Sequence, residues 1–156
     1  MNTAIAVADP AHLSGLVDSV HELFAEDGGR HDDRMDLGWP EHDGRRYYSA
    51  LLADDNALCL VAQQGNAVVG HLVGRLGGGP PLRADAVTAV LESVRVAPKV
   101  RRAGVGSALV ARFEWWARTR GARHFSVTAY SANTSAIAFY RRHGFRDLSV
   151  TLRASR

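Results

Sequence analysis

The stretch that decides the fold is VRVAPKVRRAGVGSAL, residues 94–109. Its order of residue types predicts a buried strand, a short basic turn with two glycines, and then an amphipathic helix. About four backbone N–H groups at such a helix start lack an intrahelical partner, and the macrodipole adds partial positive charge, so an anion is stabilised there. Gly104 and Gly106 would let the backbone approach that anion. Arg101 and Arg102 add charged, forked donors suited to phosphate oxygens. The stretch therefore predicts a phosphate-binding loop.

The loop differs from two common nucleotide-binding patterns. Ser107 and Ala108 follow Gly106 where an ATP-binding loop needs Lys and Ser or Thr, and the glycine spacing is not G-x-G-x-x-G. The loop does resemble the pyrophosphate-binding signature of the GNAT acyltransferase superfamily, Q/R-x-x-G-x-G/A. Residues 101–106, RRAGVG, meet that signature at every defined position.

A second block, NTSAIAFYRRHGF at residues 133–145, resembles the later signature of the same superfamily: Asn, Ala three positions on, a Tyr, and Gly-Phe closing a helix. Local physics agrees, because Asn133 or Ser135 can cap a helix start and Gly144 lies where a left-handed C-terminal cap is wanted. The two motifs stand in the expected order, and the resemblance covers about residues 87–151.

The rest of the chain predicts one α/β domain over residues 1–156. The expected elements are a strand at 4–7, a helix from Pro10 to about Phe24, a charged loop at 26–33, a helix at 43–53, a hairpin of strands 57–63 and 67–76, a loose connection at 77–81, a strand at 87–96, a helix from 105, a strand at 125–128, a helix after Asn133 and a last strand at 148–152. The resemblance implies the same order. It also implies a mixed central sheet of about six to seven strands, about four flanking helices, and two parallel strands, carrying Val94 and residues 125–128, that splay apart to admit a pantetheine arm.

Composition sets limits on the partners. The chain is 46% hydrophobic and 22% charged, with no long apolar run and no leader-like N-terminus, so we expect a cytoplasmic protein without a membrane span. Cys59 is the single cysteine and the seven histidines are scattered, so we expect no disulfide and no metal site. The isoelectric point of about 9.5 raises nucleic acid as a partner, but no aromatic and basic interleaving supports it.

Charge is unevenly distributed along the chain. Residues 1–55 carry 12 acidic side chains against 4 arginines, a formal charge of −8, whereas residues 56–156 carry 15 basic against 4 acidic ones, a formal charge of +11. A basic C-terminal half suits a cofactor with a pyrophosphate and a ribose phosphate, and an acidic N-terminal region suits a cationic acceptor. The alternative is that these charges coat solvated faces.

Acyl transfer from a thioester to an amine needs a neutral amine, a polarised carbonyl and a proton for the departing sulfur. Glu92 is the candidate base, since strand alternation would place it on one face with Val94 and Val96 beside the cofactor loop. The resemblance implies that Tyr140 donates the proton to the sulfur. Glu92 as a carboxylate paired with arginine, and Tyr140 as a core tyrosine bonded to a carbonyl, remain the structural alternatives.

The resemblance also implies a cofactor, acetyl-CoA, and the residues that bind it. Asn133 would contact the pantetheine or order the splayed strands, although a plain helix cap would look the same in sequence. Main-chain groups of Val94 and Val96 would pair with pantetheine amides. The full expected set is Val94, Arg95, Val96, Arg101, Arg102, Ala103, Gly104, Val105, Gly106, Ser107, Asn133 and Tyr140.

The acceptor site is expected between the first two helices, where a dense acidic segment lies. The candidates are Glu26, Asp27, Asp32, Asp33, Asp36, Trp39 and Glu92, of which most acidic members are expected to be solvated surface. The leading hypothesis is an N-acetyltransferase acting on a small polycationic amine, either an aminoglycoside-type antibiotic, with resistance as the outcome, or a polyamine. The alternatives are acetylation of a protein N-terminus or lysine, and an idle acyl-CoA-binding sensor. The sequence leaves open whether the chain forms a homodimer.

Overall fold

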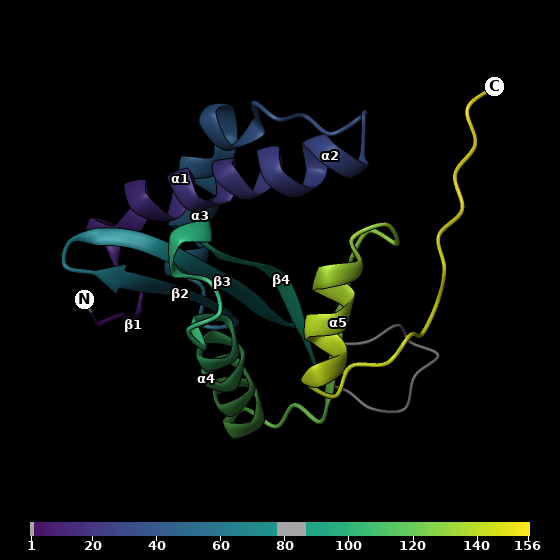
Figure 1. Cartoon of the computed structure of the whole chain (residues 1–156). Helices are drawn as coiled ribbons and strands as arrows, with labels where there is room; N and C mark the ends of the chain where they lie inside the picture. Colours follow the sequence, from purple (N-terminus) through teal and green to yellow (C-terminus); the bar gives the residue numbers. More distant parts are fainter. Residues whose placement is uncertain (1, 78–86) are drawn as a thin grey trace.

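The computed structural model describes residues 2–77 and 87–156 (Figure 1). In this part of the chain five strands form one mixed sheet in the order β1-β2-β3-β4-β5. The first four are antiparallel neighbours, and β5 runs parallel to β4. Their bounds are β1 Ala4–Val7, β2 Ala57–Gln64, β3 Ala67–Gly77, β4 Thr88–Val96 and β5 His124–Val127. The α/β class is confirmed, as is the order of the strands and helices along the chain as far as residue 142. All but the first residue of the connection expected at 77–81 lies outside the described residues.

The sheet has fewer strands than the six to seven expected. The strand predicted at 148–152 is wrong, because residues 145–156 form neither helix nor strand. The apolar alternation is present, but an isolated strand has no ladder to satisfy its backbone groups and no surface on which to bury its side chains.

The first helix is longer than predicted. α1 (Leu13–Leu23) follows a 3-10 turn at Pro10–His12, which Asp9 caps through the backbone N–H of Ala11, and it continues through a π-helical turn, Phe24–Gly28, into α2 (Gly29–His31). The loop expected at 26–33 is therefore helical as far as His31. Charged side chains on the outer face of a helix reach solvent as easily as those of a loop, so polarity alone did not distinguish the two.

Helices cover both faces of the sheet (Figure 1). α1 and α3 (Arg45–Leu52) pack on one face around Leu16, Val20, Tyr48 and Val73. α4 (Val105–Thr119) packs on the other face, where its predicted inward side chains Val105, Leu109, Val110, Phe113 and Ala117 are all buried. α5 (Thr134–Arg142) stands beside the β5 end of the sheet. Its Phe139 and Tyr140 pack against the apolar cluster between α4 and the sheet, which includes Leu91, Leu109 and Phe113 and is called the α4 cluster below.

A bulge in β4 decides where Glu92 lies. Val73 pairs with Ser93 but Gly74 pairs with Leu91, so Glu92 is the extra residue of the ladder. Its carboxylate reaches Tyr47 of α3, whereas Val94 and Val96 pack against the cluster around α4. The expectation that Glu92 shares a face with Val94 and Val96 is therefore wrong, because the bulge interrupts the two-residue alternation.

The two parallel strands separate beyond the middle of β4. Their pairing runs from Thr88 with His124 to Leu91 with Val127 and stops there, while β4 continues to Val96. β5 ends at Val127, so residues 92–96 have β3 on one edge and no strand on the other in the described part of the chain, as the expected parting of the two strands requires. We call this unpaired edge of β4 the gap.

Candidate functional site

The predicted phosphate-binding loop makes a left-handed turn before α4. Gly104 caps α4 with a φ of 81°, and Arg102 before it also has a positive φ of 65°. A Cβ on Gly104 would meet nothing within 4 Å, so this glycine supplies the left-handed turn and leaves open space at the helix start. The orphan N–H groups of the first α4 turn stand beside that space.

Gly106 was expected to let the backbone approach a ligand, but in the structure its missing side chain makes room for a neighbouring helix. A Cβ there would lie 3.2 Å from the ring of Phe139, so Gly106 allows α4 and α5 to approach each other rather than a ligand to approach the backbone. Nearby, the hydroxyl of Ser107 lies 3.0 Å from Nε2 of His143, which follows α5. Of the other loop residues, Val105 is buried in the core and Ala103 is exposed.

Three charged side chains connect the helical turn Phe24–Gly28 with the end of β4 and with the loop at 101–106 that was predicted to bind the cofactor. Arg95 donates two hydrogen bonds to Glu26, at 2.8 and 3.2 Å, and Arg101 donates a third at 3.2 Å. The hydrogen bond from Arg95 is the main reason that the pKa of Glu26 is lowered, so this carboxylate stays ionised. Glu26 was expected to touch the acceptor, but it is held by the two arginines.

Main-chain groups of β4 line the gap. The Nε of Arg101 donates to the carbonyl of Val96 at 2.8 Å, so that carbonyl faces away from β3. The Arg95 carbonyl points the other way, lying 2.7 Å from the Cβ position of Gly70 on β3. Because successive residues direct their main-chain groups to opposite edges, those of Val94 and Val96 both face the gap. An extended ligand could pair there as a strand does.

Tyr140 lies on α5 and packs against the apolar cluster that also includes Val94, Val96 and Val127. Burial, and secondarily the charge of Asp27, raises the pKa of its hydroxyl to about 12, so the phenol keeps its proton at neutral pH. Within residues 2–77 and 87–156 its hydroxyl has no hydrogen-bond partner, unlike that of a core tyrosine tied to a carbonyl. Such a hydroxyl is available to a ligand.

Asn133 both caps α5 and bridges to the helical layer. Its Oδ1 accepts from the backbone N–H of Ala136 at 3.2 Å, and its Nδ2 donates to Asp27 at 2.9 Å. The predicted cap is confirmed. Asp27, expected at the acceptor site, also lies 3.9 Å from Nε2 of His31.

Glu92 sits in a polar cluster that includes residues outside the predicted set. Tyr47 of α3 donates its hydroxyl proton to Glu92 at 2.5 Å, and Arg75 of β3 lies 3.9 Å from the other carboxylate oxygen. Arg75 also donates to the Tyr47 hydroxyl at 3.2 Å. Desolvation, followed by the hydrogen bond to Glu92, raises the pKa of Tyr47. Glu92 therefore has the arginine neighbour, Arg75, that is expected if Glu92 is a structural carboxylate. The separation of 3.9 Å is too long for a hydrogen bond, and Glu92 remains exposed.

The remaining residues predicted to bind the acceptor do not form one cluster, and each has its own neighbours. Arg153 holds Asp32 through two hydrogen bonds of 2.9 and 3.1 Å, which lower the pKa of Asp32 to about 2. Asp36 caps its own turn through the Gly38 N–H, and Asp33 is exposed. Trp39 stacks on Phe24 with ring centroids 5.8 Å apart, so it packs among aromatic side chains.

A chain of buried polar side chains next to Glu92 was not predicted from the sequence. His71 on β3 is fully buried, with its Nδ1 2.6 Å from the Ser19 hydroxyl and its Nε2 3.0 Å from the Ser93 hydroxyl. Ser93 is the neighbour of Glu92 at the bulge. Alternation along β3 places His71 inward, but the partners from α1 and β4 depend on tertiary packing.

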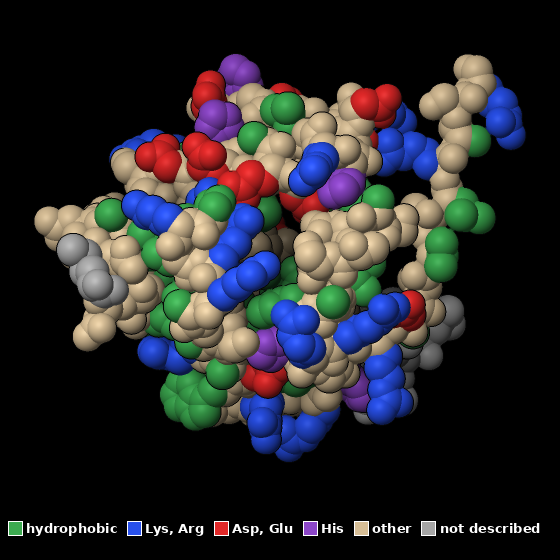
Figure 2. All heavy atoms as spheres, viewed as in Figure 1, with side chains coloured by type: hydrophobic (Ala, Val, Ile, Leu, Met, Phe, Trp, Pro, Cys, Tyr) green, Lys and Arg blue, Asp and Glu red, His purple; other side chains and the backbone are tan. Residues whose placement is uncertain are grey.

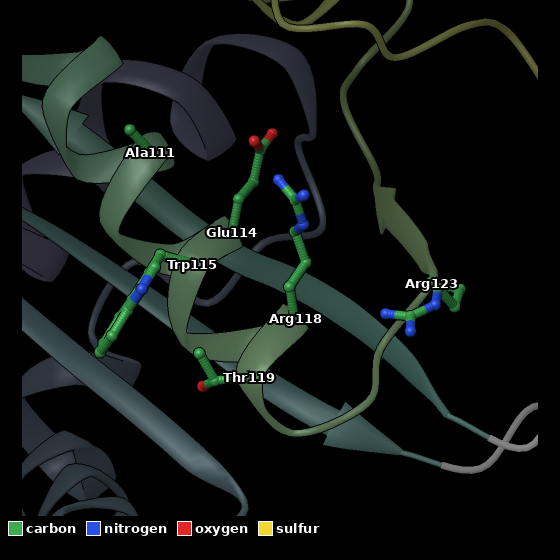
Figure 3. A pocket seen from close by; sticks show the side chains of 6 residues that line it. All are labelled: Ala111, Glu114, Trp115, Arg118, Thr119 and Arg123. Atoms are coloured by element: carbon green, nitrogen blue, oxygen red, sulfur yellow. The ribbon is translucent and has the colours of Figure 1, made fainter.

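An open groove of about 550 Å³ lies apart from these residues, on the outer face of α4. Figure 3 shows its lining side chains, Ala111, Glu114, Trp115, Arg118, Thr119 and Arg123. None of the predicted site residues lines it. Among residues 2–77 and 87–156, no group of three His, Cys, Asp or Glu could hold a metal ion. In that same part of the chain, every helix is too short or too polar to span a bilayer.

The comparisons with known proteins agree with this geometry. The model of the acetyltransferase (GNAT) family matches residues 17–145, most of the chain. The chain therefore belongs to the GNAT acetyltransferase family, whose members take acetyl-CoA as the acyl donor.

Particular relatives match part of the chain. It is 38% identical over 61 residues to aminoglycoside N(6')-acetyltransferase type 1 of Klebsiella aerogenes, a stretch covering 39% of the chain and 40% of that protein. It is 36% identical over 63 residues to acetyl transferase GW6a of Oryza sativa subsp. japonica, covering 40% of the chain and 15% of that protein. The chain thus spans less than half the length of either relative.

Solved structures match over the whole chain. The apo aminoglycoside 6'-N-acetyltransferase AAC(6')-IG of Acinetobacter haemolyticus superposes with a TM-score of 0.78 at 22% identity, covering 100% of this chain and 98% of that one. A protein of Bacillus halodurans C-125 described as a transcriptional regulator has the same TM-score at 26% identity, with 99% of both chains covered. These likenesses establish the fold.

Proposed function

We propose that the chain is an acetyl-CoA-dependent N-acetyltransferase that acetylates a primary amine of an aminoglycoside-type polycation. One observation carries the reaction class: residues 92–96 of β4 have no strand on one edge in the described part of the chain, and the strand leads into a left-handed turn and a helix start that can hold an anion. The Tyr140 phenol on α5, which keeps its proton at neutral pH, supports the same class. The relatives named for aminoglycoside acetylation support the acceptor class. We further propose one acetyltransferase domain over residues 1–156, in the cytoplasm, where acetyl-CoA is supplied.

The residues present fit the cofactor. The start of α4 offers N–H groups and open space at Gly104 for the pyrophosphate, and the main-chain groups of Val94 and Val96 face the gap for the pantetheine amides. Arg101 now donates to the Val96 carbonyl, so its side chain must turn away when a pantetheine takes that carbonyl. Acetyl-CoA supplies the activated acetyl thioester. Bond formation between the amine nitrogen and the acetyl carbon then accompanies cleavage of the C–S bond.

The protein moves the two protons of this exchange. Tyr140 gives its proton to the departing sulfur, and solvent then restores the phenol. Glu92 accepts a proton from the amine, directly or through water, because a primary amine of pKa near ~10 is about one part in a thousand neutral at pH 7. Tyr47 and Arg75 fix the carboxylate in place.

The acceptor is drawn by the acidic helical layer. Figure 2 shows acidic side chains gathered over the region of α1 to α3, with arginines concentrated below and around α4 and α5. Arginine hydrogen bonds hold Glu26 and Asp32. Arg75 lies 3.9 Å from Glu92, beyond hydrogen-bond distance, so Asp27, Asp33 and Glu92 are the members we propose to face the amine groups. Asp36 and Trp39 act in the local turn and in packing.

Two other acceptors and one non-catalytic role compete with this proposal. A polyamine would use the same charges, and a protein lysine or N-terminus would need a longer groove. The likeness to a protein described as a transcriptional regulator favours an acyl-CoA sensor as the second candidate function. The accessible Glu92 carboxylate and the free Tyr140 hydroxyl argue for catalysis instead.

A thiol-release assay with acetyl-CoA tests the proposal across aminoglycosides, polyamines and lysine peptides. We expect coenzyme A release with aminoglycosides and a mass gain of one acetyl group on an amine. A sensor would bind acetyl-CoA, seen as a raised Tm, but release no thiol with any acceptor. An unchanged Tm with coenzyme A would refute the cofactor assignment itself.

A further inference from the structure

The polar chain around His71 links α1 to the bulge of β4. The imidazole of His71 lies between two serine hydroxyls, with Ser19 of α1 2.6 Å from its Nδ1 and Ser93 of β4 3.0 Å from its Nε2. Burial lowers the pKa of His71 to about 3, so the ring is neutral at pH 7 and has one donor and one acceptor nitrogen. Each hydroxyl therefore satisfies one ring nitrogen. Because the chain ends in the core at the buried Ser19, it holds groups in place and does not pass protons to solvent.

The side chains around the bulge show which group is held in place. Neighbouring side chains of a regular strand point to opposite faces of the sheet. Leu91 and Val94 lie in the α4 cluster, but the two residues between them both reach the face that α1 and α3 cover. Glu92 contacts α3 through its carboxylate, and Ser93 bonds to the buried imidazole. The bulge thus places two consecutive side chains on one face.

The two contacts restrain the bulge to different degrees. Glu92 and Arg75 are exposed, so water competes for the hydrogen bonds that each forms with Tyr47. Water does not readily replace the bond between Ser93 and His71, because the ring is fully buried. A ring nitrogen left without a partner there would be costly. The buried bond is therefore the stronger restraint on the bulge.

We propose that Ser93, held by His71, is a positioning residue that keeps the Glu92 carboxylate on the face of β4 where the acceptor binds. This inference rests on the proposed function, in which Glu92 takes a proton from the amine. Without the bond to His71, Ser93 is free to turn. The strand can then return to two-residue alternation, which carries Glu92 toward the opposite face. Ser93 acts through Glu92 and not on the substrate.

Steady-state kinetics with acetyl-CoA and an aminoglycoside test the proposal with two matched variants. Ser93→Ala and Ser19→Ala each remove one hydroxyl from the same buried ring, so both should lower the Tm. Ser93→Ala should also lower kcat at least ~10-fold with the KM of acetyl-CoA unchanged, because it releases the base. Ser19→Ala should keep kcat within about twofold of the wild type, as should Ser93→Thr, which retains a hydroxyl. Equal losses of kcat in the two alanine variants, or no loss in Ser93→Ala, overturn the proposal.

The Glu92→Gln background shows whether Ser93 acts through Glu92. In that background Ser93→Ala should lower kcat by less than about twofold, because no base remains to be positioned. Its effect on the Tm should persist. A further loss of about tenfold in kcat would mean that Ser93 acts independently of Glu92, and the proposal would fail.

A measurement on Tyr47 separates this proposal from the proposed function. Desolvation and then the hydrogen bond to Glu92 raise the pKa of Tyr47, so this pKa reports where Glu92 lies. NMR titration of isotope-labelled tyrosine, assigned with Tyr47→Phe, should show a lowered pKa in Ser93→Ala, as in Glu92→Gln, and an unchanged pKa in Ser19→Ala. If the wild type acetylates no amine but Tyr47 responds in this way, the proposed function fails and the positioning by Ser93 stands. An unchanged Tyr47 pKa in Ser93→Ala overturns the positioning itself.

Discussion

Tyr140 is the residue whose state is most closely tied to the proposed chemistry. Its hydroxyl is protonated at neutral pH and lacks a protein partner in residues 2–77 and 87–156. Tyr140→Phe should therefore lower kcat on the order of tenfold to a thousandfold while the affinity for acetyl-CoA is retained, because it removes a proton donor and little apolar area. Steady-state kinetics and calorimetric titration measure the two quantities. Unchanged turnover with a slowly released amine would make Tyr140 a packing residue.

His71 allows a prediction about pH. Complete burial lowers its pKa from 6.5 to about 3, so the folded protein holds it neutral while the unfolded chain protonates it below pH 6.5. The unfolded state binds the extra proton, so stability falls as the pH drops from 6.5 toward 3. Between pH 7 and pH 4.5 this residue should cost about 2 to 3 kcal/mol of unfolding free energy.

Urea denaturation at the two pH values checks this effect in the wild type and in His71→Gln. The variant should lose less stability on acidification than the wild type, whatever its stability at pH 7. An identical loss in both proteins would show that His71 is not the group responsible.

The conformation of a residue could be predicted from the sequence where a local motif determines it. It could not be predicted where contacts with distant parts of the chain determine it. The cap by Asn133 and the left-handed Gly144 follow from local backbone chemistry. The true face of Glu92 depends on a bulge between two strands, and alternation within one strand cannot reveal it.

At the scale of elements, α4 and α5 meet at Gly106 and Phe139, next to the proposed cofactor loop. Gly106 permits this contact because a Cβ would lie 3.2 Å from the Phe139 ring. Gly106→Val should therefore destabilise the fold by about 1 to 3 kcal/mol, and Phe139→Ala should relieve part of that cost. In a double-mutant cycle by chemical denaturation, we expect a coupling of at least ~1 kcal/mol.

Gly104→Val is the matched control for this cycle. Its cost comes from the φ of 81°, and no atom lies within 4 Å of the added Cβ, so it should be additive with Phe139→Ala. Equal coupling in the two cycles would mean that Phe139 acts through the loop as a whole and not through contact with Gly106.

Most elements could be predicted because each carries its own period and its own end signals. The hairpin of β2 and β3 around Gly65 and the inward face of α4 are examples. Two elements were wrong. The helical continuation through residues 24–31 has a polar sequence, and the segment at 148–152 has a strand pattern but pairs with no strand in the described part of the chain. Both depend on what lies next to the segment, which periodicity does not encode.

At the scale of the whole molecule, charge is separated between two regions that meet at the gap. Acidic side chains gather over the region of α1 to α3, and arginines gather around α4 and α5 (Figure 2). We propose that the acidic layer attracts the acceptor and that the arginines attract the cofactor. Pairs such as Glu26 with Arg95 and Arg101 join the two regions, so much of the charge is compensated where they touch. What attracts a distant ligand is the uncompensated remainder on each side.

This separation predicts how salt should affect the two substrates. The Debye length falls from about 10 Å at 0.1 M to about 3 Å at 1 M salt, so attraction between separated charges weakens while contact pairs persist. Raising NaCl from 0.05 to 0.5 M should therefore increase the KM of a polycationic aminoglycoside several-fold and leave kcat nearly unchanged. A monoamine acceptor should show a much smaller change, since fewer charges interact with the acidic layer.

Asp33→Asn should reduce the salt dependence for the polycation, because Asp33 is an exposed carboxylate of that layer. A KM that stays flat with salt, or a neutral acceptor that outperforms every polycation, would refute the charge argument and leave the acetyltransferase proposal standing on the gap and the cofactor loop.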